Sequence, residues 1–202
     1  MRTFLCIPIE DHLQEAIFEY SNKVSSLVSV RSSWVKEGNF HVTLRFLGEI
    51  DPMFTLELKS MCGRVVREAA PFDLVIDRLG AFPSVERPRV LWIGGSAPWA
   101  FRELVARLNR ELEASGFRRE RKSSVSHVTL ARIKGRPDAS IKTVLNSPEL
   151  SPLWTIPVDR LVLMESRLTS RGPVYSPLFT VRFGDDEEGS HYGSSGERDN
   201  AL

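Results

Sequence analysis

Apolar residues recur at helical or strand spacing along most of the chain. Three segments carry an apolar side chain every three or four positions, as one face of a helix does, and they begin near Leu13, Phe54 and Phe101. A shorter helix is expected near 141–145. Apolar and polar residues alternate, or apolar residues form short runs, in seven segments that we predict to be strands: 2–9, 40–47, 72–77, 89–93, 125–133, 154–164 and 174–183. The mixture of both kinds of element predicts an α+β fold.

The end of the chain has a different composition. Residues 184–202 are rich in Gly, Ser and acidic residues and show no hydrophobic period, so we expect a disordered acidic tail after one domain at 1–183. The tail has six acidic residues and one basic residue, Arg198, and the whole chain has a net charge of +1, which leaves +6 for residues 1–183. A moderately basic body suits a polyanionic ligand such as RNA.

Several classes of protein are disfavoured by what the sequence lacks. No apolar run approaches the roughly 20 residues that cross a bilayer, and the first nine residues do not read as a secretory signal. Only Cys6 and Cys62 are present, too few for a disulfide framework or a CxxC metal site. We expect a monomeric protein of the reducing cytoplasm that does not insert into membranes.

The tetrapeptide HVTL occurs twice, at 41–44 and at 127–130. Side chains alternate between the two faces of a strand, so His41 and Thr43 share one face, and the same holds for His127 and Thr129. About one helix-containing unit precedes each copy. A duplicated architecture of two lobes is therefore expected.

These residue types suit phosphoryl chemistry. Histidine titrates near neutral pH, so one imidazole can act as a base while the other acts as an acid. A threonine hydroxyl can hydrogen-bond a phosphate oxygen and is held stiffly by its β-branch. A single His-x-Thr in a strand is more often a partly buried histidine without a special role. Two identical copies in a chain with four histidines favour a catalytic pair.

The sequence gives little support for other kinds of catalytic site. Two histidines are too few for a catalytic zinc, which normally has three protein ligands. The sequence has no HExxH, no GxSxG elbow, no GxGxxG and no Walker-type phosphate loop. We therefore expect no metal and no cofactor.

With the two motifs in place, the chain resembles the two-histidine (2H) phosphoesterase superfamily, and within it the RNA 2',3'-cyclic phosphodiesterases, also known as 2'-5' RNA ligases. The likeness covers most of residues 2–183. It is carried by the segments RTFLCIPI, WVKEGNFHVTLRFLGEI, RLGAFPSVERPRVLWIGG, SHVTLARIK, VDRLVLMESRL and GPVYSPL. The resemblance implies a bilobal, pseudo-symmetric fold with two antiparallel sheets backed by helices and a central catalytic cleft.

The resemblance also implies roles for five residues. His127 would be the general base that activates water, and His41 the general acid that protonates the leaving 3' oxygen. Thr43 and Thr129 would hold phosphate oxygens. Arg132, at the end of the HxTxxR form of the second motif, would stabilise the transition state without a metal.

Two arginines raise a question of strand geometry. Arg132 lies at an odd offset from His127, so a regular strand would place it on the opposite face, and a bulge or strand end must turn it back. Arg45 has the same parity as His41 and is a candidate phosphate contact. Weaker candidates for RNA contact are the charge run 118–122 and the aromatic residues Phe46, Trp92 and Trp34.

The predicted function is hydrolysis of RNA 2',3'-cyclic phosphate ends to 2'-phosphomonoesters. The same histidines would serve 2'-5' ligation of tRNA halves or hydrolysis of small cyclic nucleotides, so these alternatives stay open. The partner is an RNA or nucleotide with a 2',3'-cyclic phosphate, with tRNA fragments among the candidates. A non-catalytic RNA-binding module and a metal-dependent phosphodiesterase are the alternatives of other classes.

Overall fold

The computed structural model describes residues 1–120, 125–170 and 172–184. Its helices lie where the apolar spacing predicts them, and short 3-10 turns precede α2 and follow α4. The helical elements are α1 (Asp11–Leu27), η1 (Pro52–Phe54), α2 (Thr55–Arg67), α3 (Trp99–Ala114), α4 (Ala139–Leu145) and η2 (Pro148–Leu150). None of the helices in these ranges is long and apolar enough to cross a bilayer. Apart from Gly184, the predicted tail lies outside the described residues.

The strands include all the predicted segments and two further strands, at 32–34 and 78–82. They are β1 (Arg2–Pro8), β2 (Ser32–Trp34), β3 (His41–Glu49), β4 (Phe72–Ile76), β5 (Arg78–Phe82), β6 (Val90–Gly94), β7 (His127–Ile133), β8 (Trp154–Val158), β9 (Arg160–Thr169) and β10 (Gly172–Arg182). The segment predicted as one strand at 154–164 is divided at Asp159, because β8 pairs with β4 and β9 pairs with β1. The strand β2 spans three residues, too few for alternation to be seen in the sequence.

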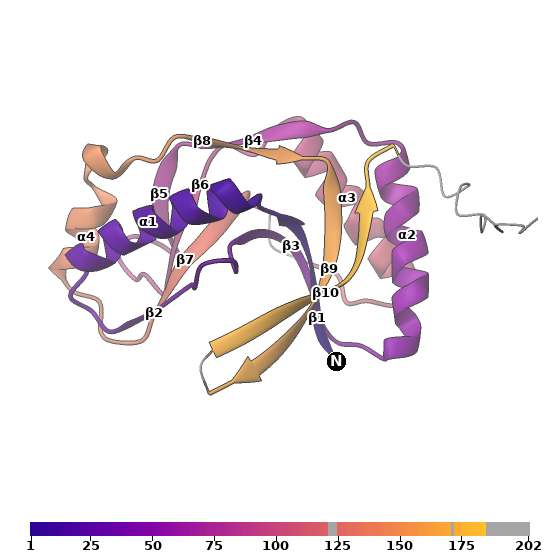
Figure 1. The fold of residues 1–202 in the computed structure, drawn as a ribbon, viewed down its shortest axis with the longest axis horizontal. Helices are drawn as coiled ribbons and strands as arrows, with labels where there is room; N and C mark the ends of the chain where they lie inside the picture. Colours follow the sequence, from indigo (N-terminus) through magenta and orange to yellow (C-terminus); the bar gives the residue numbers. More distant parts are fainter. Residues whose placement is uncertain (121–124, 171, 185–202) are drawn as a thin grey trace, which may run out of the picture.

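Two antiparallel sheets form the fold, as expected. The larger has the order β10-β9-β1-β3-β7-β6-β5 with β2 added beside β7, and the smaller consists of β4 and β8. In the larger sheet, β3 and β7 are joined at one pair, Val42 with Val128. This pair divides the sheet into two halves, β10-β9-β1-β3 and β7-β6-β5 with β2, which correspond to the predicted lobes (Figure 1). The two HVTL motifs therefore meet at the centre of the molecule.

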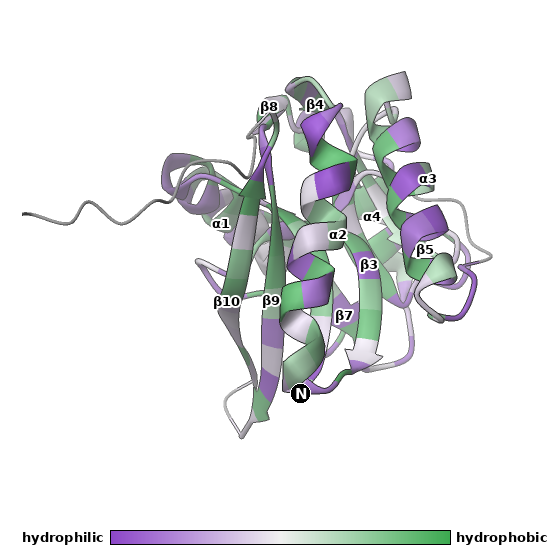
Figure 2. Cartoon of the chain, turned by 90° about the vertical axis from the view of Figure 1, so that its right-hand side faces the viewer, coloured by the Kyte–Doolittle hydropathy of each residue, from purple (hydrophilic) through white to green (hydrophobic). Residues whose placement is uncertain are grey.

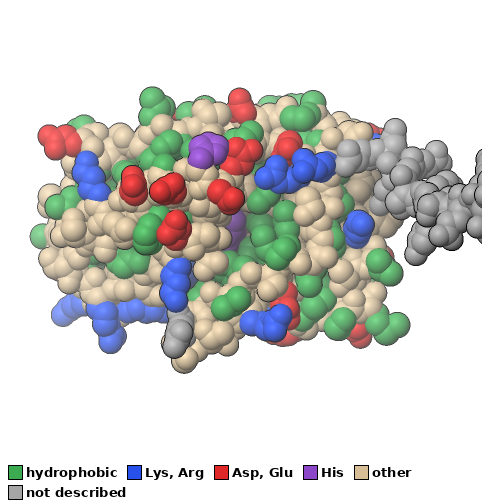
Figure 3. All heavy atoms as spheres, viewed as in Figure 1, with side chains coloured by type: hydrophobic (Ala, Val, Ile, Leu, Met, Phe, Trp, Pro, Cys, Tyr) green, Lys and Arg blue, Asp and Glu red, His purple; other side chains and the backbone are tan. Residues whose placement is uncertain are grey.

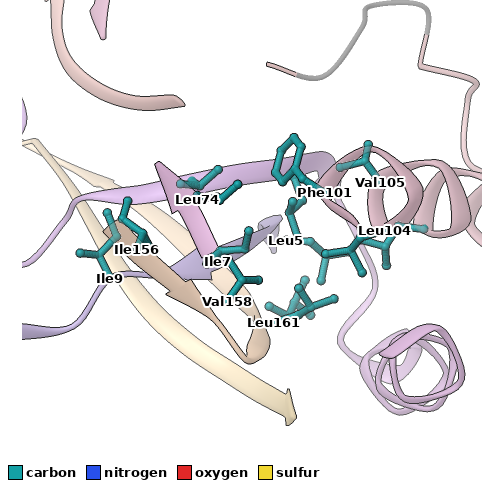
Figure 4. Packing of buried hydrophobic residues seen from close by; sticks show 14 of the residues in the cluster. Leu5, Ile7, Ile9, Leu74, Phe101, Leu104, Val105, Ile156, Val158 and Leu161 are labelled. Atoms are coloured by element: carbon teal, nitrogen blue, oxygen red, sulfur yellow. The ribbon is translucent and has the colours of Figure 1, made fainter. Parts of the chain in front are cut away.

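One face of the larger sheet carries the main core. Leu5, Val42 and Leu130 point from β1, β3 and β7 into a cluster that includes Phe101 and Leu104 of α3. Figure 4 shows Leu5 beside Phe101 and Leu104, and Ile7 beside Val158. The helices α2 and α3 turn their hydrophilic faces outward (Figure 2). Because the aliphatic residues of both motifs are used for packing, the histidines and threonines are left on the other face.

Candidate active site

The histidines and threonines of the two motifs share one face of the sheet. Val42 and Val128 are fully buried on the helix-covered face. Their neighbours in the chain are only half-buried; these are His41, Thr43, His127 and Thr129. The pairing of Val42 with Val128 is antiparallel, so His41 lies toward Thr129, and Thr43 lies toward His127. The predicted catalytic residues are thus brought together. Figure 3 shows a hollow at the centre of the molecule with a recessed histidine in it.

Each imidazole is held by a carbonyl two residues before it in the chain. His41 Nδ1 lies 2.8 Å from the Asn39 carbonyl oxygen, and His127 Nδ1 lies 2.8 Å from the Val125 carbonyl oxygen. A carbonyl can only accept, so Nδ1 carries the hydrogen in both rings. The Nε2 atom of each neutral imidazole is then left with a lone pair that can take a proton.

Aromatic rings support both imidazoles. The ring of His41 lies 4.8 Å from Phe4 and 5.3 Å from Tyr175, centroid to centroid. The ring of His127 lies 4.9 Å from Phe82 and 6.2 Å from Trp92. The arrangement restricts ring orientation on both sides of the site. No local pattern in the sequence signals this role for Phe4, Tyr175 or Phe82, because only long-range strand contacts bring these rings to the motifs.

Burial makes both imidazoles harder to protonate. Desolvation lowers the pKa of His41 to about 4, with a smaller contribution from the nearby His127, and the bond to the Asn39 carbonyl opposes the shift. Desolvation also lowers the pKa of His127, with a contribution from the charge of Arg132 against the bond to the Val125 carbonyl. Both rings are therefore neutral at pH 7 in the free protein.

A bulge in β7 brings Arg132 to the face that carries the histidines and threonines of the motifs. Trp92 pairs with Thr129 but Leu91 pairs with Ala131, so Leu130 is an extra residue. Val90 then pairs with Arg132, and since Val90 and Trp92 share a face of β6, Arg132 shares a face with Thr129. The expected bulge is present. Arg132 is exposed, and its charge acts on His127.

A matching bulge in β3 takes Arg45 away from this face, so its predicted role as a phosphate contact is not supported. Cys6 pairs with Thr43 but Leu5 pairs with Arg45, which makes Leu44 the extra residue. Arg45 is 7% exposed, and it donates to Asn109 Oδ1 at 2.9 Å and to the Arg118 carbonyl. It therefore joins β3 to α3 and to the segment that follows α3. The parity argument failed because it assumed a regular strand.

The weaker candidates for RNA contact lie in different environments. Phe46 takes the place in the first motif that Arg132 has in the second, and it is 60% exposed beside Phe4. Trp34 is packed against the core clusters. In the charge run, Arg119 lies 4.0 Å from Glu113 and Glu120 lies 3.9 Å from Arg45, while Arg121 and Lys122 lie outside the described residues. Within the described ranges, no group of three or more His, Cys, Asp or Glu residues is placed to hold a metal ion.

Comparison with known proteins agrees with this arrangement. The model of the LigT-like phosphoesterase family matches residues 7–92 and 96–175. The RNA 2',3'-cyclic phosphodiesterase of Thermotoga maritima is 32% identical over 183 residues, which is 91% of this chain and 96% of the relative. The enzyme of the same name from Aquifex aeolicus is 32% identical over 80% of this chain and 88% of its own length.

Solved structures share the fold. The crystal structure of TT0787 of Thermus thermophilus has a TM-score of 0.75 at 26% identity and covers 95% of this chain and 100% of that one. Escherichia coli LigT complexed with 3'-AMP has a TM-score of 0.74 at 24% identity, over 91% of this chain and 98% of that one. The family match, the relatives and the paired motifs agree, and the chain belongs to the LigT-like phosphoesterase family.

Proposed function

We propose that this protein hydrolyses 2',3'-cyclic phosphate ends of RNA to 2'-phosphomonoesters, with His127 and His41 as base and acid and without a metal. The observation that carries the proposal is the pair of His-x-Thr units on one face, each imidazole fixed through Nδ1 with Nε2 left for proton transfer. The names of the relatives from T. maritima and A. aeolicus support the substrate. The assignment of base and acid rests on the family resemblance.

The proposed step is an in-line displacement at phosphorus. His127 Nε2 takes a proton from water as the water oxygen bonds to phosphorus. The bond between phosphorus and the 3' oxygen breaks, and His41 Nε2 delivers a proton to that oxygen. The product has a 2'-phosphate and a 3'-hydroxyl, so one water is consumed and no further reactant is needed.

Thr43, Thr129 and Arg132 would hold the non-bridging oxygens. Two hydroxyls, one from each lobe, can donate to the phosphate from both sides. The guanidinium of Arg132 supplies positive charge near His127, where it can balance charge that builds up on the oxygens in the transition state. Removal of the Arg132 guanidinium should therefore lower kcat as well as raise KM.

The lowered pKa values fit this scheme only if substrate changes them. His41 must carry a proton to act as the acid, and in the free protein its pKa lies at about 4. A bound phosphate anion favours the protonated form of a nearby imidazole and raises its pKa. Substrate binding would then charge the acid, while the free protein avoids two charged imidazoles side by side.

The test is turnover of an oligoribonucleotide that ends in a 2',3'-cyclic phosphate, measured in EDTA. We expect wild type to release a 2'-phosphate, and His41→Ala and His127→Ala each to lose on the order of 10²–10⁴-fold in kcat, the usual contribution of a positioned acid or base. His12→Ala serves as the control, because His12 is an exposed histidine on α1. Loss of activity in EDTA would disprove the metal-free scheme, and binding without turnover would favour an RNA-binding module.

A further inference from the structure

Five basic side chains gather where three strands of one lobe end. Backbone bonds hold these ends together, because Ile133 donates to the Arg89 carbonyl and Lys134 to the Arg31 carbonyl, each at 2.9 Å. Arg132 lies between Ser33 of β2 and Val90 of β6. We call the exposed side chains at this place the basic ridge; they are Arg31, Arg89, Arg132, Lys134 and Arg136. Figure 3 shows Lys and Arg side chains at the lower left edge, over this end of the lobe.

The basic ridge differs from the arginine-rich surface formed by α2 and α3. Between α2 and α3, Arg64 lies 3.1 Å from Glu111, and Arg110 lies 3.4 Å from Glu103. Within the described ranges, none of the five cations of the ridge has an acidic partner within 4.0 Å. The ridge therefore keeps its positive charge for an external partner.

The carboxylates in the flanking segments are already engaged. Glu86 accepts a hydrogen bond from the Ser84 side chain and is near Lys142, and these contacts hold its pKa below the usual range. Asp138 accepts from the Ser140 backbone at 2.9 Å and from the Ser140 hydroxyl at 2.5 Å, as the cap of α4. Neither carboxylate is paired with a ridge cation, so the local field is positive.

The ridge is continuous with the candidate active site. The bulge at Leu130 places Arg132 on the same face as Thr129, and the charge of Arg132 acts on both His127 and Tyr175. From Arg132 the chain passes directly to Lys134 and Arg136. A phosphate held at the motifs would thus lie at one end of an uncompensated row of cations.

We propose that the basic ridge binds the backbone phosphates of the RNA upstream of the cyclic phosphate, so that the site prefers a polynucleotide to a mononucleotide. This inference rests on the proposed function. Cations that contact phosphates do not read sequence, so the ridge gives affinity for RNA in general. Each contact also releases a counterion, which makes binding depend on salt.

The experiment compares two substrates in two variants. The substrates are an oligoribonucleotide ending in a 2',3'-cyclic phosphate and cytidine 2',3'-cyclic phosphate. The ridge variant is Lys134→Gln with Arg136→Gln, and its matched control is Arg64→Gln with Arg110→Gln on the paired surface. Neither variant alters the motifs or Arg132.

We expect the ridge variant to raise KM for the oligonucleotide about tenfold, because it removes two phosphate contacts that each contribute about as much as an ordinary hydrogen bond. KM for the mononucleotide and both kcat values should be unchanged, as should all constants of the control. The slope of log KM against log salt for the oligonucleotide should fall by about 1.4, since each phosphate of a single strand that is no longer neutralised lowers it by about 0.7. An unchanged KM, or an equal rise in the control, would overturn the proposal.

Failure of the proposed function would be visible separately. If wild type turned over neither substrate, the ridge would still be tested by direct binding of an oligoribonucleotide that ends in a 2'-phosphate. Weaker binding by the ridge variant than by the control would support the ridge, and equal binding would refute it.

Discussion

Arg45 and Arg132 show how one inserted residue decides what a side chain does. Each follows a motif with the same first four residues, and each strand has its bulge at the leucine of the motif. The residue five places after the histidine is brought to the face that carries the histidines, and that residue is Phe46 in one lobe and Arg132 in the other. Of these two matching positions, one carries a positive charge and the other carries an aromatic ring.

This difference predicts opposite effects for two substitutions. Arg132→Met should lower kcat/KM by about 10²–10³-fold, the range for loss of one transition-state donor, with little effect on stability because the side chain is exposed. Arg45→Met should leave kcat of the folded protein nearly unchanged but cost about 2–4 kcal/mol, because the Arg118 carbonyl and Asn109 lose their donor. Kinetics and urea denaturation on both variants check this. A large loss of kcat in folded Arg45→Met would restore Arg45 as a phosphate contact.

The lowered pKa of His41 predicts a dependence of stability on pH. The unfolded chain binds this proton near pH 6.5, while the folded protein binds it only near pH 4. The contribution of His41 to the free energy of unfolding is therefore fully present above pH 6.5. As pH falls toward 4, the unfolded chain takes up the proton first, and the free energy of unfolding decreases by about 2–3 kcal/mol. Urea denaturation at pH 7 and pH 4.5 should show a smaller difference in His41→Gln than in wild type. The same difference in both proteins, with His12→Gln as the control, would contradict the shift.

At the scale of elements, β5 and β6 hold the ring that supports His127. Gly80 pairs with Trp92, and a Cβ at Gly80 would lie 2.3 Å from the indole. Gly80→Ala should therefore displace Trp92, destabilise the protein by about 1–3 kcal/mol and lower kcat/KM. Adding Trp92→Phe, which removes the second ring, should recover the stability. Thermal denaturation of both variants measures this, and a fully stable Gly80→Ala would show that the indole has room to move.

The same strands show which features a sequence can predict. Apolar spacing located the four helices, because each buries one face in the core. The repeated HVTL placed each histidine on the same strand face as its own threonine, because alternation is a local property of a strand. The position of Arg45 was wrong, because a bulge depends on the register with the neighbouring strand. The rings of Phe4 and Tyr175 were not anticipated at His41, because strands far apart in sequence bring them there.

At the scale of the whole molecule, the two lobes share the larger sheet through a single pair of valines. Because β3 and β7 pair only at Val42 and Val128, the histidines and threonines next to these valines form no further pairs between the two strands. The two identical motifs run antiparallel to each other at this junction. The repeat of the motif on either side of this junction thus places one imidazole from each lobe on the same face of the larger sheet.

Charge also acts at the scale of the whole molecule. Residues 185–202 carry six acidic side chains and one basic side chain, so a chain ending at Gly184 would have a net charge of +6 in place of +1. RNA should approach and bind the shorter chain more readily, because repulsion by the acidic residues is removed. We expect KM for an oligoribonucleotide to fall severalfold at roughly 0.01 M salt, where screening is weak, and to become equal for both chains near 1 M salt. Cytidine 2',3'-cyclic phosphate, with one charge, should show a much smaller change. An equal KM for the oligoribonucleotide in both chains at low salt would mean that the charge of these residues does not reach the RNA.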